Sequence, residues 1–421
     1  MLQRRMTGGE CMKTAAVIAE YNPFHNGHRY QLECARKKCG ADYVVVLLCG
    51  DYTQRGEPAM IDKYSRTRAA LVSGADLVIG MQVSTAVSGA ERYAGGAVSE
   101  LNALGAVDYL CFGSECGDTG KLEETAGFLD MPPAEYTERV GIYLKQGYTY
   151  ARARQQALDD MAADPGRSAQ CPDPKILKGP NNILGIEYIR ALKKTGSRIR
   201  PVTVLRTGAG HDSSEHRGDI ASASILRKYI TEGDIDTAAD FMPDYQTRLI
   251  RAAYGTGCPV TADDFSLLLH DRIIRSSAEE LAGYYESSQG IAARIKRKEA
   301  AFTGYTEFAR LLKSKEMTYS RISRTLMHIV LGIREQPGET GYIRVLGFRK
   351  SAQPLLHEIS VRSDVPVITK VADAEKDLSG EALREFRQDI LSAGIYNNII
   401  LDKFGTVMRD EYRVQFPVLD I

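Results

Sequence analysis

The sequence predicts an α/β fold in which a parallel, doubly wound sheet occupies the first half of the chain and a mainly helical region follows it. Three observations support this prediction. Short apolar runs alternate with segments of helical spacing four times before residue 120. The run at 43–49 is apolar throughout, which is typical of a strand that is covered on both faces. Beyond Asp234 the alternation fades, and helical patterns follow one another.

The first strand and the first helix are expected on either side of a tight turn. Residues 15–19 (AAVIA) form a short, uncharged apolar run, which predicts a buried strand. The run ends before Asn22-Pro23, because proline cannot donate to a sheet ladder and disfavours helix in the residue before it. Helical spacing begins after His28 and continues through Lys37.

The same alternation predicts the next elements. The helix after Lys178 contains Asn181 and Asn182, one of which is placed either to cap the helix or to contact a ligand. The expected elements are a strand at 43–49, a helix from Asp62 to Ser73, a strand at 76–80, a helix at about 89–104, a strand at 107–112, a helical stretch at 131–150, a loop at 164–174, a helix ending near Leu192, a strand at 201–205 and a helix beginning in the Ser-rich stretch 220–227.

Polar loops follow three of the predicted strands, at 23–28 (PFHNGH), 50–58 (GDYTQRGEP) and 113–115 (GSE). Parallel sheets of this kind bind ligands at the carboxyl ends of their strands, so we expect the three loops to open onto one crevice. In the stretch 220–227 (IASASILR), the serines are either plain helix caps or, with Arg227 one turn on, a second phosphate-binding edge.

Two histidines in the first turn are the leading candidates for chemistry. A helix that begins after a parallel strand presents unpaired N–H groups and the positive end of its dipole, which favours a phosphate. His25 and His28 add imidazole donors at the same place and are suited to stabilise the charge that develops as pyrophosphate leaves. A metal pair or two satisfied surface imidazoles is the alternative. Zinc is poorly supported, because no third His or Cys lies nearby at ligand spacing.

Composition sets broader limits. At 421 residues the chain is long enough for two or three domains, and its 54 basic and 54 acidic residues indicate no partner by net charge. The eight cysteines form no CxxC pair and fit a reducing compartment. The chain has no apolar run long enough for a membrane span and no apolar signal segment, so we expect a cytoplasmic protein. Residues 1–11 have no periodicity, and Met12 is the expected natural start.

The predicted helical region is locally basic. Helices are expected at 265–285, 291–312 and 319–332, and residues 365–401 are expected to form a small closing subdomain. Between Gly290 and Ser351 there are thirteen Lys and Arg but only five Asp and Glu. Such a segment in a neutral protein is a candidate surface for RNA, and a solvated helical face is the alternative.

Several motifs carry a family resemblance. PFHNGH resembles the HxGH signature of the nucleotidyltransferase superfamily, and IASASILR resembles its second signature, ISSTxIR, with Ala223-Ser224 in place of Ser-Thr. EYNPFHNGH, QRGEPA, FGSE, GPNNILG, GAGHD (208–212) and IASAS occur in the order seen in the tRNA(Met) cytidine acetate ligase family. The likeness covers nearly the whole chain from Met12, although GAGHD, which contains His211, is one residue shorter than the family's GAGYHD.

The resemblance implies a Rossmann-like nucleotidyltransferase domain at 12–233 that binds ATP, after an extension at 1–11. A mainly helical, basic domain at 234–421 would bind tRNA. The implied enzyme is a ligase that makes acetyl adenylate and pyrophosphate from acetate and ATP, with Mg²⁺ expected as the companion of ATP. It then transfers the acetyl group to N4 of the wobble cytidine, C34, of elongator tRNA(Met), which gives N4-acetylcytidine.

Site residues also follow from the resemblance. His25, His28 and Arg206 are the expected catalytic residues, Arg227 would bind phosphate charge, and Lys178, Gln54 and Arg55 are weaker candidates for acetate or the triphosphate. No protein ligand to a metal is predicted. ATP is expected along Ile18, Ala19, Glu20, Tyr21, Asn22, Pro23, Phe24, His25, Asn26, Gly27, His28, Arg29, Tyr30 and Gln31, with Gly113, Asn181 and Arg206 completing the site.

Two other functions stay open from the residues themselves. One is a nucleotidyltransferase that acts on a small phosphorylated metabolite, and the other is a tRNA-binding protein without catalytic activity. The sequence predicts neither the oligomeric state nor the features that would select one tRNA.

Overall fold

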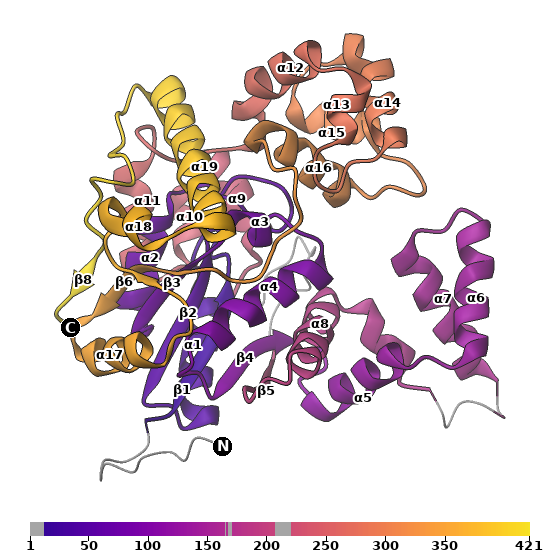
Figure 1. Cartoon of the computed structure of the whole chain (residues 1–421), viewed down its shortest axis with the longest axis horizontal. Coiled ribbons are helices and arrows are strands. Elements are labelled where there is room, and N and C mark those ends of the chain that lie inside the picture. Colours follow the sequence, from indigo (N-terminus) through magenta and orange to yellow (C-terminus); the bar gives the residue numbers. More distant parts are fainter. Residues whose placement is uncertain (1–11, 165, 167–170, 207–219) are drawn as a thin grey trace.

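One eight-stranded sheet forms the centre of the molecule (Figure 1). The computed structural model describes residues 12–164, 166, 171–206 and 220–421. The strands lie in the order β5-β4-β1-β2-β3-β6-β7, with β8 beside β6, and β1 to β5 are mutually parallel. The strands are β1 (Thr14–Ala19), β2 (Tyr43–Cys49), β3 (Leu77–Met81), β4 (Tyr109–Ser114), β5 (Arg200–Leu205), β6 (Ile343–Arg349), β7 (Val367–Ile368) and β8 (Val418–Leu419).

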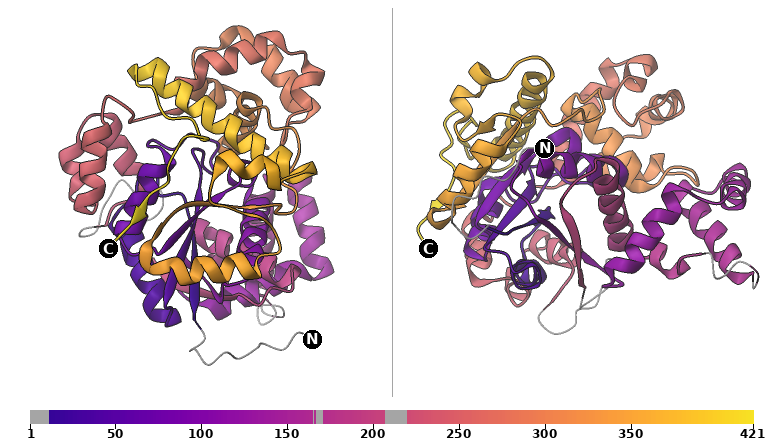
Figure 2. Two further views of the ribbon diagram at one scale, coloured as in Figure 1. Left: turned by 60° about the vertical axis from the view of Figure 1, so that its left-hand side comes forward. Right: turned by 60° about the horizontal axis from the view of Figure 1, so that its bottom comes forward.

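Helices cover both faces of the sheet, as the two views in Figure 2 show. The predicted α/β class is therefore confirmed. The α-helices are α1 (Asn26–Cys39), α2 (Lys63–Val72), α3 (Val83–Ala86), α4 (Ala90–Ala103), α5 (Thr119–Asp130), α6 (Ala134–Lys145), α7 (Tyr150–Ala163), α8 (Pro180–Lys194), α9 (Ala223–Thr231), α10 (Ile235–Ala239), α11 (Asp244–Ala253), α12 (Ser266–Arg275), α13 (Ala278–Ala282), α14 (Gln289–Lys298), α15 (Tyr305–Leu312), α16 (Tyr319–Leu331), α17 (Gln353–Arg362), α18 (Val371–Asp377) and α19 (Gly380–Phe404).

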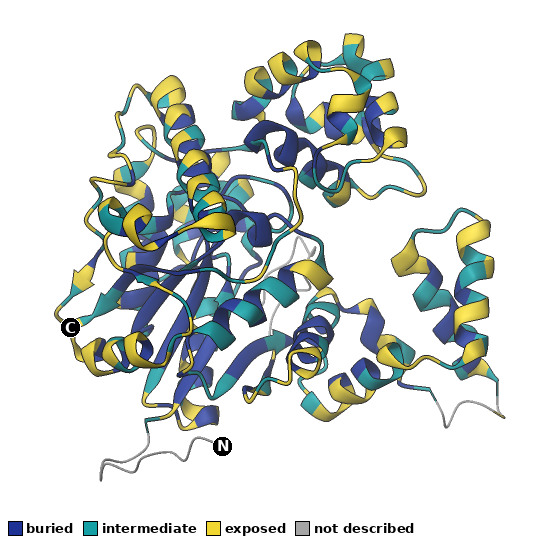
Figure 3. Ribbon diagram, viewed as in Figure 1, coloured by how far each residue is buried: buried dark blue, intermediate teal, exposed yellow. Residues whose placement is uncertain are grey.

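The central strands are buried on both sides, as their apolar sequences predict (Figure 3). Along β2, Val45 and Leu47 pack into the core that α4 and α8 cover. Their neighbours Val44 and Val46 point the other way, into the core beneath α1 and α2. Successive residues of a strand face opposite sides of a sheet, so a run without polar residues is required where both sides are covered.

The stretch between β4 and α8 differs from its prediction. The helical stretch expected at 131–150 is broken, and α5, α6 and α7 form an arm that extends away from the sheet (Figure 1). Pro133 is the N-cap of α6, because proline is disfavoured inside a helix. Between α6 and α7 the chain turns at Gly147, whose φ is 81°.

The helical region after Asp234 has its own core. Helices α12 to α16 pack around Phe265, Leu269, Phe308 and Leu326, and α19 adds Tyr396, Ile399 and Ile400 at helical spacing. The helices predicted at 265–285 and 291–312 are each divided in two. Ser277 caps α13 after the first break, and the second break lies at 302–304.

The sheet also receives strands from the C-terminal part of the chain. Strand β6 pairs antiparallel with β3, and β7 and β8 pair with β6. The sheet therefore extends past the boundary expected at residue 233. Residues 343–349, expected to belong to a basic helical surface, form a strand because their apolar side chains complete the two cores of the sheet.

Candidate functional site

A cavity lies at the carboxyl ends of β1, β4 and β5, where the sequence predicts a crevice. It has a volume of about 200 Å³ and adjoins a smaller one of about 50 Å³, and the two share His25, His28, Gly113 and Arg206 in their walls. Residues of the loops 23–28, 50–58 and 113–115 line this space. The expected convergence of the three loops is confirmed.

The two histidines form the first turn of α1. His25 is the N-cap, and its Nδ1 accepts a hydrogen bond from the Gly27 N–H at 3.1 Å. The Nδ1 atom of His28 accepts one from the His25 N–H at 3.3 Å, which completes a reciprocal capping box. An imidazole whose Nδ1 accepts carries its proton on Nε2 when it is neutral. Each ring therefore keeps one N–H donor that backbone capping does not use.

Both imidazoles are held in the neutral form. Burial, together with smaller effects from the nearby cations Arg206 and Arg227, lowers the pKa of His25 to about 3. Burial also lowers the pKa of His28 well below its ordinary value, with smaller effects from His25 and Arg206. The two rings stack with centroids 3.7 Å apart, a contact that two imidazolium cations would oppose. At neutral pH they are hydrogen-bond donors without charge.

Arg206 and Gly113 act as a pair. Arg206 follows β5 directly, and its backbone N–H donates to the Ser114 carbonyl at 2.9 Å. Its side chain lies against Gly113, since a Cβ atom at that glycine would be 3.1 Å from Arg206 Cγ. Glycine therefore leaves the guanidinium room to reach the cavity. Burial lowers the pKa of Arg206, and Glu115 offsets only part of this effect, so the cation lacks a full counter-charge.

The prediction that Asn181 or Asn182 caps α8 is wrong, because Gly179 is the N-cap and Pro180 begins the helix. The carboxylate of Glu115 accepts the N–H groups of both asparagines instead. The alternative, a ligand contact, stays a prediction for Asn181, which lines the cavity. Asn182 is buried and does not line it.

The Ser-rich start of α9 is confirmed, with Ser222 as the N-cap and as a lining residue of both cavities. Arg227 lies behind this wall. Its Nη1 donates to the Asn22 carbonyl at 2.9 Å, and its side chain lines a separate groove on the far side of the turn. Arg227 thus supports the turn that precedes α1. Lys178 is also outside the cavity, where its Nζ lies 3.6 Å from Asp159 Oδ1.

Most of the residues expected to bind ATP line the two cavities. Four do not: Pro23 and Phe24 are buried beneath the turn, the Asn26 N–H donates to the Phe241 carbonyl, and Arg29 is exposed. The motif GAGHD with His211, and the extension 1–11, lie outside the described residues. The lining residues among those predicted are Ile18, Ala19, Glu20, Tyr21, Asn22, His25, Gly27, His28, Tyr30, Gln31, Gln54, Arg55, Gly113, Asn181 and Arg206.

Sequence reasoning missed two groups of residues. Tyr93, Phe112, Leu184 and Tyr188 form an apolar and aromatic part of the cavity wall. They belong to elements that were predicted, but nothing in their spacing shows which side chains reach the cavity. Arg66 is the second omission, and it is wholly buried in α2.

The Arg66 guanidinium binds backbone carbonyls where β1 and β2 end. Nη1 donates to Glu20 O at 2.7 Å and Cys49 O at 3.0 Å, and Nε donates to Ile61 O at 2.9 Å. Nη2 donates to the carbonyl of Gly50. This side chain fixes the strand ends from which two of the three cavity loops depart. Its only sequence signal is an arginine on the same helix face as Ala69 and Ala70.

The loop 50–58 is also anchored to the helical region. The Gly56 carbonyl accepts hydrogen bonds from Tyr305 at 3.1 Å and Ser323 at 2.9 Å. A Cβ atom at Gly56 would lie 2.3 Å from the backbone nitrogen of Arg324, so only glycine allows this contact with α16. The loop that brings Gln54 and Arg55 to the cavity is therefore held by helices from the second half of the chain.

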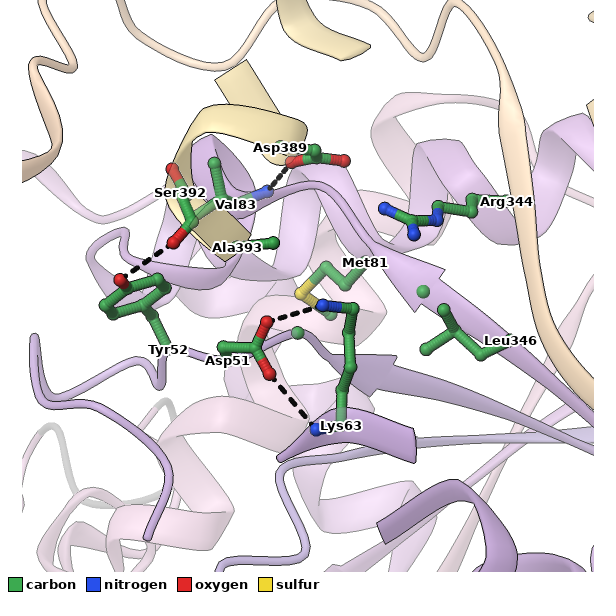
Figure 4. Close-up of a pocket in the computed structure, with 12 residues that line it drawn as sticks. Asp51, Tyr52, Lys63, Met81, Val83, Arg344, Leu346, Asp389, Ser392 and Ala393 are labelled. Atoms are coloured by element: carbon green, nitrogen blue, oxygen red, sulfur yellow. Dashed lines mark hydrogen bonds and ion pairs between the residues drawn. The ribbon is translucent and has the colours of Figure 1, made fainter. Parts of the chain in front are cut away.

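A second polar pocket, of about 30 Å³, lies near the same end of the sheet (Figure 4). Lys63 Nζ is 2.6 Å from Asp51 Oδ2 and 2.6 Å from Glu411 Oε1, and Arg344 forms an ion pair with the other oxygen of Glu411. Burial works against each charge, but the opposite charges outweigh it, raising the pKa of Lys63 and lowering the pKa of Glu411. We call Asp51, Lys63, Arg344 and Glu411 the paired cluster.

The basic surface is smaller than the sequence predicts. Arg344 lies in the paired cluster, and Arg349 donates to the Leu71 carbonyl. Arg324 forms a largely buried ion pair with Glu286 at 2.8 Å. The exposed basic residues of the segment in the helical region are Arg297, Arg310, Lys313, Lys315, Arg321 and Arg334.

Among the helices of the described residues, none is long and apolar enough to cross a bilayer. In the same ranges, no group of three or more His, Cys, Asp or Glu side chains is arranged to hold a metal ion.

Comparison with known proteins agrees over most of the chain. Residues 12–410 match the HIGH Nucleotidyl Transferase family. A protein of Thermoanaerobacter sp. (strain X514) named tRNA(Met) cytidine acetate ligase is 37% identical over 390 residues, covering 91% of this chain and 95% of that protein. One of the same name from Caldanaerobacter subterraneus subsp. tengcongensis is 38% identical over 391 residues, with the same coverage. The crystal structure of Thermotoga maritima TmcAL bound with alpha-thio ATP has a TM-score of 0.87 and 28% identity, covering 97% of this chain and 100% of that one.

Proposed function

The chain belongs to the tRNA(Met) cytidine acetate ligase family, within the HIGH nucleotidyltransferases, and from this premise we propose that it acetylates the wobble cytidine of elongator tRNA(Met). It uses ATP and acetate to make acetyl adenylate and then transfers the acetyl group to N4 of C34. The observation that carries the proposal is a cavity with neutral imidazole donors and an under-neutralised arginine at the N-terminus of α1. Such a site is suited to an anion that carries several phosphates.

The reaction needs two steps. The amine of cytosine is a poor nucleophile because its lone pair is delocalised into the ring, and acetate is a poor electrophile because it is an anion. In the first step an acetate oxygen bonds to the α-phosphorus and the bond to the bridging oxygen of pyrophosphate breaks. In the second step N4 attacks the acetyl carbon, AMP leaves with the electron pair of the C–O bond, and the nitrogen loses a proton. Activation thus replaces oxide with AMP as the leaving group.

The site stabilises charge rather than supplying a nucleophile. The Nε2–H groups of His25 and His28, at the positive end of the α1 dipole, donate to phosphate oxygens, on which negative charge grows as pyrophosphate departs. Neutral imidazoles do this without having to lose a proton first. Arg206 approaches from β5 and neutralises charge near the same phosphates. Ser222, the N-cap of α9, offers a further hydroxyl donor.

The cavity residues do not form a cage for Mg²⁺. Glu20 is the one carboxylate among the described residues that line the two cavities, and its Oε1 already accepts the Gln54 N–H at 2.9 Å. Mg²⁺ commonly keeps several waters and binds substrate phosphates. We therefore assign no step to a protein-held metal, and Mg²⁺ would arrive with ATP.

The tRNA is proposed to lie over the exposed basic residues of the helical region. These lie on α14, α15 and α16, between α15 and α16, and just after α16, in the part of the chain that also anchors the loop 50–58. The cytidine must leave the stack of its anticodon loop to reach the cavity. We propose that residues 234–421 supply most of this contact and that residues 12–233 bind ATP.

The test is the complete reaction. The protein is incubated with ATP, acetate and elongator tRNA(Met), the RNA is digested to nucleosides, and N4-acetylcytidine is quantified by mass spectrometry. We expect the product only when all three substrates are present, with initiator tRNA(Met) as the control. A metabolite nucleotidyltransferase would instead release pyrophosphate without RNA or acetate, and a non-catalytic tRNA-binding protein would bind tRNA but form no adenylate.

A further inference from the structure

We propose that Glu115 is a positioning residue that fixes the Asn181 amide so that the nucleotide cavity presents a hydrogen-bond acceptor at this point of its wall. The inference rests on the proposed ATP site and deepens it, because it names the chemical group that the site recognises. That group is a hydrogen-bond donor on the nucleoside part of the ligand.

The carboxylate of Glu115 binds the start of α8 with both oxygens. Oε1 accepts from the Asn181 backbone N–H at 3.1 Å and from Asn181 Nδ2 at 2.6 Å. Oε2 accepts from the Asn182 N–H at 2.8 Å. A Cβ atom at Gly179 would lie 2.4 Å from Oε2, so the glycine before the helix makes room for this contact. The helix thus receives its capping acceptor from the loop after β4.

The contact determines which end of the Asn181 amide faces the cavity. An ionised carboxylate can only accept hydrogen bonds, so the amide nitrogen must point at Glu115. The amide oxygen then points the other way, where Arg206 Nη1 donates to it across 3.4 Å. This distance is long for a strong hydrogen bond, and a carbonyl oxygen accepts two donors, so Oδ1 has capacity left for a ligand.

Hydrogen bonds to Asn182 in turn keep the backbone of Glu115 in place. Asn182 Oδ1 accepts from the backbone N–H groups of Glu115 at 2.9 Å and Cys116 at 3.1 Å, and Asn182 Nδ2 donates to the Ile176 carbonyl at 3.0 Å. Asn182 is buried, whereas Glu115 is exposed. The buried amide therefore fixes the loop backbone, and the exposed carboxylate fixes the amide that reaches the cavity.

The consequence is a preference among nucleotides. An acceptor in the wall favours a ligand that offers a donor there, and a nucleoside offers its ribose hydroxyls or the 6-amino group of adenine. An amide with the opposite orientation would present a donor and would reverse the preference. Glu115 lines neither cavity, so it acts on the ligand through Asn181, which it orients, and through the charge that it places near Arg206.

Exchanging the carboxylate of Glu115 and the amide of Asn181 tests whether the first orients the second. In Glu115→Gln the side-chain oxygen can still accept the Asn182 N–H, but the new amide nitrogen faces the donors of Asn181. In Asn181→Asp two carboxylates face each other. The double variant Glu115→Gln/Asn181→Asp restores a hydrogen bond with its direction reversed, and an oxygen again faces Arg206. We expect each single variant to weaken ATP binding by about tenfold and the double variant to recover most of this loss.

Binding is measured by calorimetry on the full chain with ATP, 2′-deoxy-ATP, 3′-deoxy-ATP and purine riboside triphosphate, which lacks the 6-amino group. The parent protein should discriminate against one of these analogues, which identifies the donor, and Glu115→Gln should lose that discrimination. Glu124→Gln, an exposed change on α5, serves as the matched control and should match the parent for all four ligands. Thermal unfolding of each variant shows whether it folds.

The outcomes separate this inference from the proposed function. A parent protein that does not bind ATP contradicts the proposed function. A parent that binds ATP, together with Glu115→Gln that keeps full affinity or loses affinity equally for all four nucleotides, overturns the positioning role. A double variant no better than the weaker single variant also overturns it, because Glu115 and Asn181 would then act separately.

Discussion

Two groups of polar side chains lie near the same end of the sheet and differ in how their charge is balanced. In the paired cluster, Lys63 and Arg344 face Asp51 and Glu411, and the opposite charges raise the pKa of Lys63 and Arg344 and lower the pKa of Glu411. In the cavity, Arg206 is exposed without a full counter-charge, and both histidines are held neutral. The first arrangement is complete within the chain, whereas the second becomes complete when an anion arrives. The balanced charges of the paired cluster thus stabilise the fold, whereas the unbalanced charge of the cavity is suited to bind a ligand.

Breaking the paired cluster should have the largest effect. Lys63→Met leaves Asp51 and Glu411 buried without their shared cation, which should lower the free energy of unfolding by about 3–5 kcal/mol. Chemical denaturation measures this change. Arg275→Met, which removes an exposed ion pair with Asp271, is the control and should leave the midpoint unchanged. Equal midpoints for Lys63→Met and the parent would mean that the cluster is not a stabilising unit.

Removing a cavity donor should affect chemistry instead of stability. His28→Ala should lower the rate of adenylate formation by about 100-fold, because it removes a donor to the charge that develops on the phosphates. Pyrophosphate release measures this rate, and the affinity for tRNA should stay within about twofold, because none of the exposed basic residues of the helical region lines the cavity. Full activity in this variant would eliminate the phosphate role of the histidine pair.

The two groups should also respond to different pH ranges. The pKa of His25 falls from its ordinary 6.5 to about 3 on folding, so the unfolded chain binds the proton more tightly and stability falls as pH drops below about 6.5. Glu411 also has a lowered pKa, and its stabilisation is lost only as pH falls below its ordinary 4.5.

The variant His25→Asn keeps a good N-cap residue and removes this titration. The free energy of unfolding of His25→Asn, relative to that of the parent, should therefore rise by about 2 kcal/mol as the pH falls from 6.5 to 4.5. Glu411→Gln should leave the parent's pH dependence intact over that range. Parallel stability curves for His25→Asn and the parent would show that the imidazole is already accessible to protons in the folded protein.

The same contrast should appear when one arginine is removed from each group. Arg206→Met should lower ATP affinity by about tenfold while leaving the free protein about as stable as the parent, because the guanidinium is exposed and only partly paired. Arg344→Met should destabilise the free protein, because Glu411 loses a partner. Thermal shift with and without ATP compares the two, and a large destabilisation by Arg206→Met would show that its charge is already balanced.

Exposed charges should have the smallest individual effects. Arg321→Glu should weaken tRNA binding about threefold at moderate salt and reduce the salt dependence, while ATP binding stays unchanged. Lys194→Glu, at the end of α8 far from the cavity, is the control. Arg324 is unsuitable for this test, because its ion pair with Glu286 makes it part of the fold. Binding curves at several salt concentrations measure the effect.

Local patterns predicted the elements well where one physical rule dominates. Residues 43–49 form β2 because both faces are covered, and Asp62 and Ser222 cap their helices as their types suggest. The convergence of three loops followed from sheet geometry alone. Long-range pairing was beyond these rules, because the apolar run 343–349 becomes β6 only through contact with β3.

The candidate site was predictable in the same uneven way. His25 and His28 stood out because two imidazoles occupy a helix start. Arg66 was not predictable, since its role depends on carbonyls from three other segments. Neither was Glu115, whose capping acceptor for α8 comes from a distant loop and takes the place expected for Asn181 or Asn182. Side chains that act across the fold leave no local spacing to detect.

The pairing of β3 with β6 has a consequence for synthesis on the ribosome. Strand β3 leaves the ribosome early with an apolar, unpaired edge, and its neighbour β6 is made only after most of the helical region. The nascent chain therefore exposes an unpaired apolar strand edge for most of its translation, and such an edge favours chaperone binding or self-association. Slowing elongation between the two strands should raise the fraction of aggregated nascent protein.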